Sequence, residues 1–119
     1  MDSLVPYSSN NLLACFSEFL RIKVAQGDAT FDTLRGYLTQ GRSWVSWCEA
    51  QGIKAALATT KDIEYFIANR ISLNYKRNSI VHTLSVIKRL YDALIWHGLR
   101  KDNPAAGVKA PKDRSCKED

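Results

Sequence analysis

Apolar residues recur along most of this chain at the three- and four-residue spacing of an α-helix, in four separate segments. The first segment follows the capping-type residues Ser9 and Asn10 and ends near Gln26. The second begins at about residue 32 and ends before Gly52. No segment alternates apolar and polar residues for long enough to predict a strand. The pattern therefore predicts an all-α fold.

Two further helices are predicted in the second half of the chain. Thr59 or Thr60, followed by Asp62, is an N-terminal signal because a threonine oxygen can accept from an unpaired N–H and an acid favours the positive helix end. Ser79 is expected to cap the last helix, which ends at Gly98. The residues expected to face inward are Ile63, Phe66, Ile67 and Ile71, then Ile80, Leu84, Ile87, Tyr91, Leu94 and Ile95, with Leu90 at the edge. Four helices with short connections predict a compact four-helix bundle.

The chain changes character after Gly98, where prolines, small residues and charges dominate. Pro104 and Pro111 forbid a regular helix, so we expect a linker or tail in which little is buried. The predicted division is an N-terminal arm at residues 1–9, a helical domain at 10–99 and a linker or tail at 100–119.

The cellular setting is predicted from the cysteines and the lack of long apolar runs. Cys15, Cys48 and Cys116 show no metal-ligand spacing and are interpreted as reduced thiols, the first two in a core. No segment approaches the roughly 20 apolar residues of a membrane span, and the N-terminus lacks a signal-peptide pattern. We therefore expect a cytoplasmic protein with no membrane partner.

Positive charge is concentrated in the second half of the chain. Residues 70–112 carry nine Lys or Arg against two acids, whereas residues 1–69 carry six against seven. This asymmetry suits a polyanionic partner, and it equally suits a solvated surface that is rich in lysine.

Groups that could perform catalysis are scarce. His82 and His97 stand apart with no metal-binding partner, and no glycine-rich phosphate loop occurs, so no cofactor and no metal are expected. Asp62 and Glu64 are better explained as first-turn acids than as a carboxylate pair. A free-standing enzyme is the least favoured reading.

Polar side chains form a ridge on each of two predicted helices. Arg35, Thr39, Arg42 and Ser46 recur in steps of four, three and four, a ridge about 16 Å long. Asn78, His82, Ser85 and Arg89 form a matching ridge, with Lys76 and Arg77 at its N-terminal end. Such ridges can bind a groove of DNA, or can be ordinary solvated helix faces.

Several positions together resemble a known family. They are Thr33, Leu34, Arg35 and Tyr37, then Trp44, Trp47 and Cys48, then Asn78, Ser79 and Ile80, and finally Asn103 and Pro104. Spaced in this way, they resemble the SAM-like, or core-binding, N-terminal domain of phage integrases and Cre-like recombinases, over roughly residues 10–112. The four tryptophan and tyrosine residues Trp44, Trp47, Tyr91 and Trp96 could stack on bases, but their helical spacing among Leu and Val favours core packing.

The resemblance implies a role for each ridge. The start of the second helix would enter the major groove of DNA, with Arg35 and Gly36 facing bases or backbone and Thr33 contacting a phosphate. Gly36 stands where the family usually carries a side chain. The start of the last helix would enter the groove too: Asn78 and His82 would read bases, and Arg77 and Ser79 would contact phosphates. His82 could equally be an exposed structural residue.

The resemblance also implies what should be missing. In the family, a tyrosine nucleophile and its supporting cations, including a His-x-x-Arg box, lie in a separate C-terminal domain. His97 and Arg100 match those letters by chance, at the end of the last helix. The expected function is sequence-recognising duplex-DNA binding in recombination, with the parent's catalytic domain and possibly neighbouring protomers as partners. The alternative is a helical module that binds an acidic protein.

Overall fold

The computed structural model describes residues 9–27 and 30–110 of the chain. Its elements are α1 (Ser9–Ala25), α2 (Phe31–Ala50), the short 3-10 helix η1 (Ala55–Leu57), α3 (Thr60–Ser72) and α4 (Arg77–Trp96). These described residues contain no strand, so the expected all-α class is confirmed. None of the described helices is both long and apolar enough to cross a membrane.

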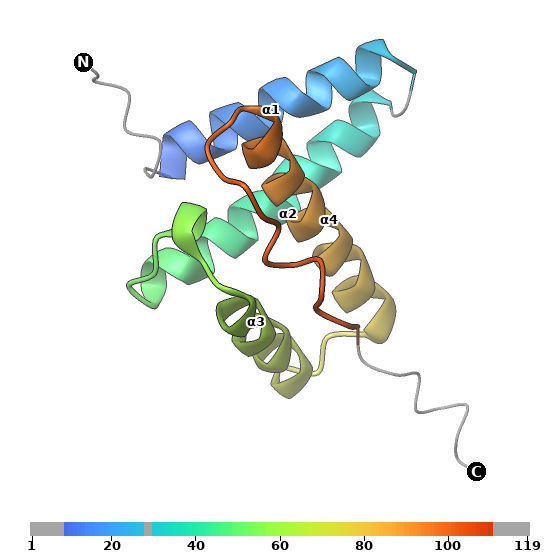
Figure 1. Cartoon of the computed structure of the whole chain (residues 1–119). Coiled ribbons are helices and arrows are strands. Elements are labelled where there is room, and N and C mark those ends of the chain that lie inside the picture. Colours follow the sequence, from blue (N-terminus) through green and yellow to red (C-terminus); the bar gives the residue numbers. More distant parts are fainter. Residues whose placement is uncertain (1–8, 28–29, 111–119) are drawn as a thin grey trace.

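The helices form two packed groups that share α4. Helices α1 and α2 lie side by side, and α4 crosses and contacts both of them. Helix α3 packs against α4 towards the opposite end of the molecule (Figure 1). Because α4 contacts all three other α-helices, it has the largest share of buried residues.

The observed helix starts confirm one predicted cap and correct another. At α3 the hydroxyl of Thr59 accepts from the Asp62 N–H at 3.2 Å, and the Asp62 carboxylate accepts from the Thr59 N–H at 2.9 Å. At α4 the prediction was wrong: the helix begins at Arg77, and Ser79 lies inside its first turn. The reason is the tight ending of α3, where Asn74 adopts a left-handed conformation (φ 65°) and turns the chain early.

The core centres on one fully buried tryptophan of α2. Trp44 packs edge-on to Phe66 of α3, with 5.1 Å between ring centroids, and its Nε1 donates to the hydroxyl of Tyr91 at 3.0 Å. The Tyr91 hydroxyl in turn donates to the Ala55 carbonyl at 2.5 Å. A single network of apolar and polar contacts thus joins α2, η1, α3 and α4.

A glycine lets α1 and α2 approach closely. A Cβ added at Gly41 would lie 3.0 Å from a ring carbon of Phe16, which is itself fully buried. A side chain at position 41 would require the Phe16 ring or one of the two helices to shift. This tight contact explains a glycine inside a helix despite its cost of about 1 kcal/mol.

Three residues expected to be buried are exposed. Ile71 is 47% exposed and Ile95 38% exposed. Each lies on the solvent-facing side of its helix. Ile71 lies seven and three residues after the exposed Glu64 and Ala68, and Ile95 lies three residues after the exposed Asp92. Trp96, at the end of α4, is 52% exposed, so the expectation of core packing was wrong for this tryptophan. Leu90, placed at the edge of the stripe, is fully buried.

The segment after α4 is not the unburied tail that the sequence suggested. Residues 99–110, here called the strap, run back along α4, and Pro104, Ala105 and Val108 are buried. The Asn103 side chain donates to the Lys88 carbonyl at 2.9 Å and to the Asp92 carboxylate at 3.0 Å. Small side chains can bury where a bulky apolar residue would not fit, which a hydrophobicity pattern does not reveal. The boundary between domain and linker remains a prediction.

The two cysteines in the described part of the chain fit the expected core positions. Cys48 is fully buried, and burial raises the pKa of its thiol to about 12. Cys15 is half-buried against the core. Burial also raises the pKa of the Cys15 thiol, so both cysteines remain protonated at neutral pH. Cys116 and the N-terminal arm lie outside the described residues.

Candidate nucleic-acid interface

The polar ridge of α2 is exposed along its whole length. Arg35, Thr39, Arg42 and Ser46 all face solvent. Arg35 forms an ion pair with Asp32 one turn earlier, and both side chains are largely exposed. Because exposed ion pairs contribute little to stability, the guanidinium of Arg35 can exchange this partner for a phosphate or a base.

At the start of α2 a threonine side chain caps the helix, and the backbone at Gly36 is not covered by other residues. Thr30, the N-cap residue, accepts from the Thr33 N–H at 3.2 Å, and the two hydroxyls lie 3.1 Å apart. The Thr39 hydroxyl donates to the Arg35 carbonyl at 3.0 Å, so it can only accept from a ligand. A Cβ added at Gly36 would meet nothing within 4 Å, so this glycine is not required by the packing of the protein.

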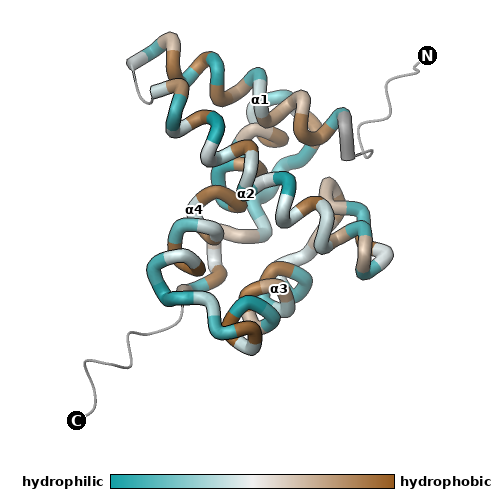
Figure 2. Tube along the Cα trace, turned by 180° about the vertical axis from the view of Figure 1, so that it is seen from behind, coloured by the Kyte–Doolittle hydropathy of each residue, from teal (hydrophilic) through white to brown (hydrophobic). Residues whose placement is uncertain are grey.

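The ridge of α4 is exposed at its N-terminal end and partly covered further along. Asn78, His82 and Ser85 are exposed, and Arg89 is half-buried. Lys76, Arg77 and Ser79 are also exposed, around the first turn. Figure 2 shows the same gathering of hydrophilic positions along the α3–α4 turn and the start of α4.

The start of α4 differs electrostatically from the starts of α2 and α3. A threonine side chain caps each of those two helices, whereas Lys76, the N-cap residue of α4, makes no side-chain capping bond. The first N–H groups of a helix have no partner inside it and carry a partial positive charge. At α4 they lie beside two basic side chains, an arrangement suited to an anion.

Two contacts bring the ridges together across the α2–α4 interface. The rings of Tyr37 and His82 have centroids 5.9 Å apart. The Thr83 hydroxyl donates to the Gln40 side-chain oxygen at 2.9 Å. His82 therefore lies at the seam between the two polar surfaces, which sequence spacing on separate helices could not reveal.

Two of the basic residues counted in the sequence are bound within the protein. Arg100 is 15% exposed and donates to the Asp102 carboxylate at 3.0 Å and to the Ala56 carbonyl at 3.1 Å. This pairing lowers the pKa of the Asp102 carboxyl. Arg70 donates to Ser43 of α2 at 2.5 Å. Of the basic residues that stay exposed, Arg35 and Arg42 lie on α2, and Lys76 and Arg77 lie at the start of α4. The other exposed basic residues are spread over the rest of the described chain: Arg21, Lys54, Lys61, Lys101 and Lys109.

The described residues contain no cluster of three or more His, Cys, Asp or Glu that could hold a metal. His97 lies 3.2 Å from the Cys15 carbonyl and packs against Trp96, while Arg100 is bound elsewhere. The two residues therefore do not form a shared site. Among the tyrosines, Tyr91 is fully buried, and burial raises the pKa of its hydroxyl.

Comparison with known proteins gives one consistent picture. Tyrosine recombinase XerD of Yersinia pestis is 32% identical over 81 residues, covering 68% of this chain and 27% of the relative. XerD of Proteus mirabilis is 31% identical over 81 residues, with shares of 68% and 26%. XerD of Rhizobium meliloti is 27% identical over 94 residues, with shares of 79% and 30%. No solved structure matches the chain significantly.

These relatives are much longer than the region they share with this protein. The chain spans about a quarter of the length of the first two relatives, as the shares of 27% and 26% show. The model of the phage integrase N-terminal SAM-like domain matches residues 16–98, which include most of α1 and all of α2, α3 and α4. The chain therefore belongs to the family of phage integrase N-terminal SAM-like domains.

Proposed function

We propose that this chain binds duplex DNA as the core-binding domain of a tyrosine recombinase, through the paired ridges of α2 and α4. The observation that carries the proposal is the seam at Tyr37 and His82, where two exposed polar ridges meet. The relatives are tyrosine recombinases, and the shared region falls on the N-terminal domain family.

The chemistry of the two ridges suits the two kinds of DNA contact. Arginine can bind guanine O6 and N7 with two hydrogen bonds, and asparagine can bind adenine in the same way. Arg35, Arg42, Asn78 and His82 are therefore proposed as base-facing residues. Cations and helix N-termini position the protein on phosphates without reading sequence. This role is assigned to Thr33, Thr39, Lys76, Arg77, Ser79 and Arg89, with Gly36 allowing close approach of the backbone.

The strap suggests how a catalytic domain of the same parent protein would be attached. Val108 and Lys109 line a groove together with Ile71, in the last turn of α3. The strap therefore returns the chain to the end of the molecule where α4 begins. A catalytic domain of the same parent protein would then be tethered on the side of the molecule where the proposed DNA surface lies. Neighbouring recombinase protomers on the same DNA would be further partners.

The test of this proposal removes single charges from the ridges. Arg35→Ala and Lys76→Ala should each weaken binding to a labelled duplex by about tenfold, because each loses a charge-assisted contact of ~1.4 kcal/mol. Their thermal midpoints should stay close to that of the unmodified chain, since exposed substitutions usually change stability by less than about 0.5 kcal/mol. Fluorescence anisotropy and circular dichroism would measure the two quantities.

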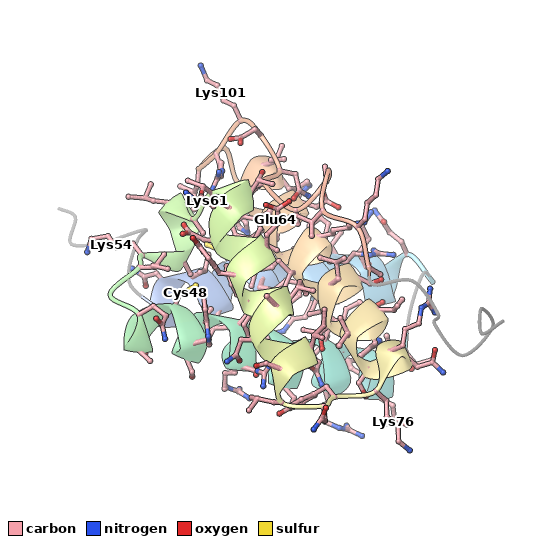
Figure 3. The ribbon with its side chains drawn as sticks, turned by 90° about the horizontal axis from the view of Figure 1, so that it is seen from below. Cys48, Lys54, Lys61, Glu64, Lys76 and Lys101 are labelled. Atoms are coloured by element: carbon pink, nitrogen blue, oxygen red, sulfur yellow. The ribbon has the colours of Figure 1, made fainter. Side chains whose placement is uncertain are left out.

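Lys61→Ala is the matched control, because it removes the same charge from an exposed residue outside the proposed surface. Figure 3 shows Lys61 in the upper part of the view, well separated from Lys76 at the lower right. The control should bind DNA as the unmodified chain does. Equal weakening by all three variants would contradict the assigned surface, and no binding by the unmodified chain would favour an acidic protein partner.

A second prediction concerns strand cleavage. Cleavage by tyrosine needs a phenolate in line with a phosphate whose developing charge meets several positioned cations. Tyr91 is buried with a raised pKa, and Tyr37 packs on His82. We therefore expect no covalent adduct when the chain is incubated with a nicked suicide duplex and separated under denaturing conditions. An adduct that disappears in one Tyr→Phe variant would contradict this expectation.

A further inference from the structure

Arg70, in the last turn of α3, is enclosed by aromatic rings and hydroxyl groups. Its guanidinium carbon lies 4.6 Å from the centroid of the Phe66 ring and 4.7 Å from that of Tyr75. One terminal nitrogen donates to the Tyr75 hydroxyl at 2.9 Å, and the other donates to the Ser43 hydroxyl at 2.5 Å. The side chain is half-buried, and its fork is directed at two different elements of the fold.

The backbone of the same residue closes the end of α3. The Tyr75 N–H donates to the Arg70 carbonyl at 3.1 Å, and the Asn74 N–H donates to the Ile71 carbonyl at 3.0 Å. With Asn74 in the left-handed region, this is a Schellman ending. Arg70 thus holds Tyr75 twice, once through its carbonyl and once through its guanidinium.

These contacts connect the two parts of the proposed DNA surface. Tyr75 directly precedes Lys76, the N-cap residue of α4. Ser43 directly follows Arg42 on α2. A side chain that bonds to both therefore fixes the distance between the α2 ridge and the start of α4. In the sequence, Arg70 is only one of the nine Lys or Arg residues between positions 70 and 112.

We propose that Arg70 is a positioning residue for DNA binding, which sets the start of α4 relative to α2 and does not itself contact DNA. The inference rests on the proposed DNA function. The guanidinium of Arg70 bonds to two separate hydroxyl groups and packs between two aromatic rings. This geometry explains why arginine stands here, since lysine offers neither the planar fork nor the stacking surface. Pre-ordering the surface before binding reduces the entropy lost on association, and so strengthens binding without adding a contact.

The decisive variants remove only hydroxyl groups that face Arg70 and leave the charge of the protein unchanged. Tyr75→Phe and Ser43→Ala should each weaken binding to a labelled duplex by roughly two- to fivefold, and Arg70→Gln by about tenfold. Adding Tyr75→Phe to Arg70→Gln should produce no further loss, because both changes break the same bond. Without DNA, amide hydrogen exchange at residues 75–78 should accelerate in Tyr75→Phe and in Ser43→Ala, while the thermal midpoint of each changes little.

Tyr65→Phe is the control, because it deletes a hydroxyl from an exposed tyrosine elsewhere on α3 and should leave binding and exchange unchanged. If Arg70 instead contacts a phosphate, Arg70→Gln should reduce the salt slope by about one unit while Tyr75→Phe has no effect. That result, or additive losses in the double variant, would overturn the inference and leave the DNA proposal standing. If Arg70→Gln does not fold, Tyr75→Phe and Ser43→Ala still decide the question. No binding by the unmodified chain would reject the DNA proposal itself.

Discussion

Trp44→Ala is expected to destabilise the domain by about 3 to 5 kcal/mol, enough to lower the thermal midpoint by more than about 10 °C. Trp44 is fully buried; it stacks on Trp47 at 5.7 Å and packs edge-on to Phe66 at 5.1 Å between ring centroids. Its removal would open a large cavity among α2, α3 and α4. It would also take the Nε1 donor away from the buried Tyr91 hydroxyl. Thermal and urea unfolding followed by circular dichroism would measure the loss.

Trp96→Ala is the matched control, since this tryptophan is 52% exposed. Its ring centroid lies 6.0 Å from that of Phe19 and 4.8 Å from that of His97. Its cost should be about 1 kcal/mol, the typical value for a substitution that opens no large cavity. A loss at Trp96 as large as the loss at Trp44 would show that the tip of α4 supports the core more than its exposure indicates.

The helices of this domain were predictable because each carries its own local signals. The spacing of apolar residues indicated α1 to α4, and Thr59 with Asp62 marked the start of α3 correctly. The N-cap of α4 was missed by three residues, Ser79 for Lys76, because the start of this helix depends on the left-handed turn at Asn74. The sequence offers that turn only as one asparagine among several polar residues. Local pattern thus predicts an element more reliably than its first residue.

The strap was missed for a tertiary reason. Ala105 and Val108 are buried because Asn103 bonds to Lys88 and Asp92, fifteen and eleven residues earlier in the chain. The Thr60 hydroxyl also donates to the Pro104 carbonyl at 2.7 Å. None of these contacts produces a periodic signal, so a segment with prolines and charges resembles a linker until the fold is known.

The candidate site shows the same division between local and tertiary information. The exposed ridges of α2 and α4 follow from helical spacing, and their exposure agrees with the sequence except at the half-buried Arg89. Their mutual placement does not follow from spacing, because it depends on the contacts of Tyr37 with His82 and of Arg70 with Ser43. The sequence therefore indicates which residues belong to such a surface, but not how those residues lie relative to one another.

Binding to duplex DNA should depend steeply on salt, because each phosphate that meets a cation releases condensed counterions. The five basic residues of the proposed surface, Arg35, Arg42, Lys76, Arg77 and Arg89, could together displace the counterions of about four to five phosphates. This predicts a log–log slope of about −4. Raising the salt from about 50 to 200 mM should then weaken binding by roughly a hundred- to a thousandfold.

The same salt titration distinguishes phosphate contacts from base contacts on the proposed surface. The slope should become shallower by about one unit in Lys76→Ala, which removes a proposed phosphate contact, and should stay unchanged in Lys61→Ala. Asn78→Ala should weaken binding to a preferred sequence without changing the slope, since an uncharged base contact releases no counterion. Binding that hardly changes with salt would contradict a surface of cations that contact phosphates. It would favour contacts on α2 and α4 that do not involve charge.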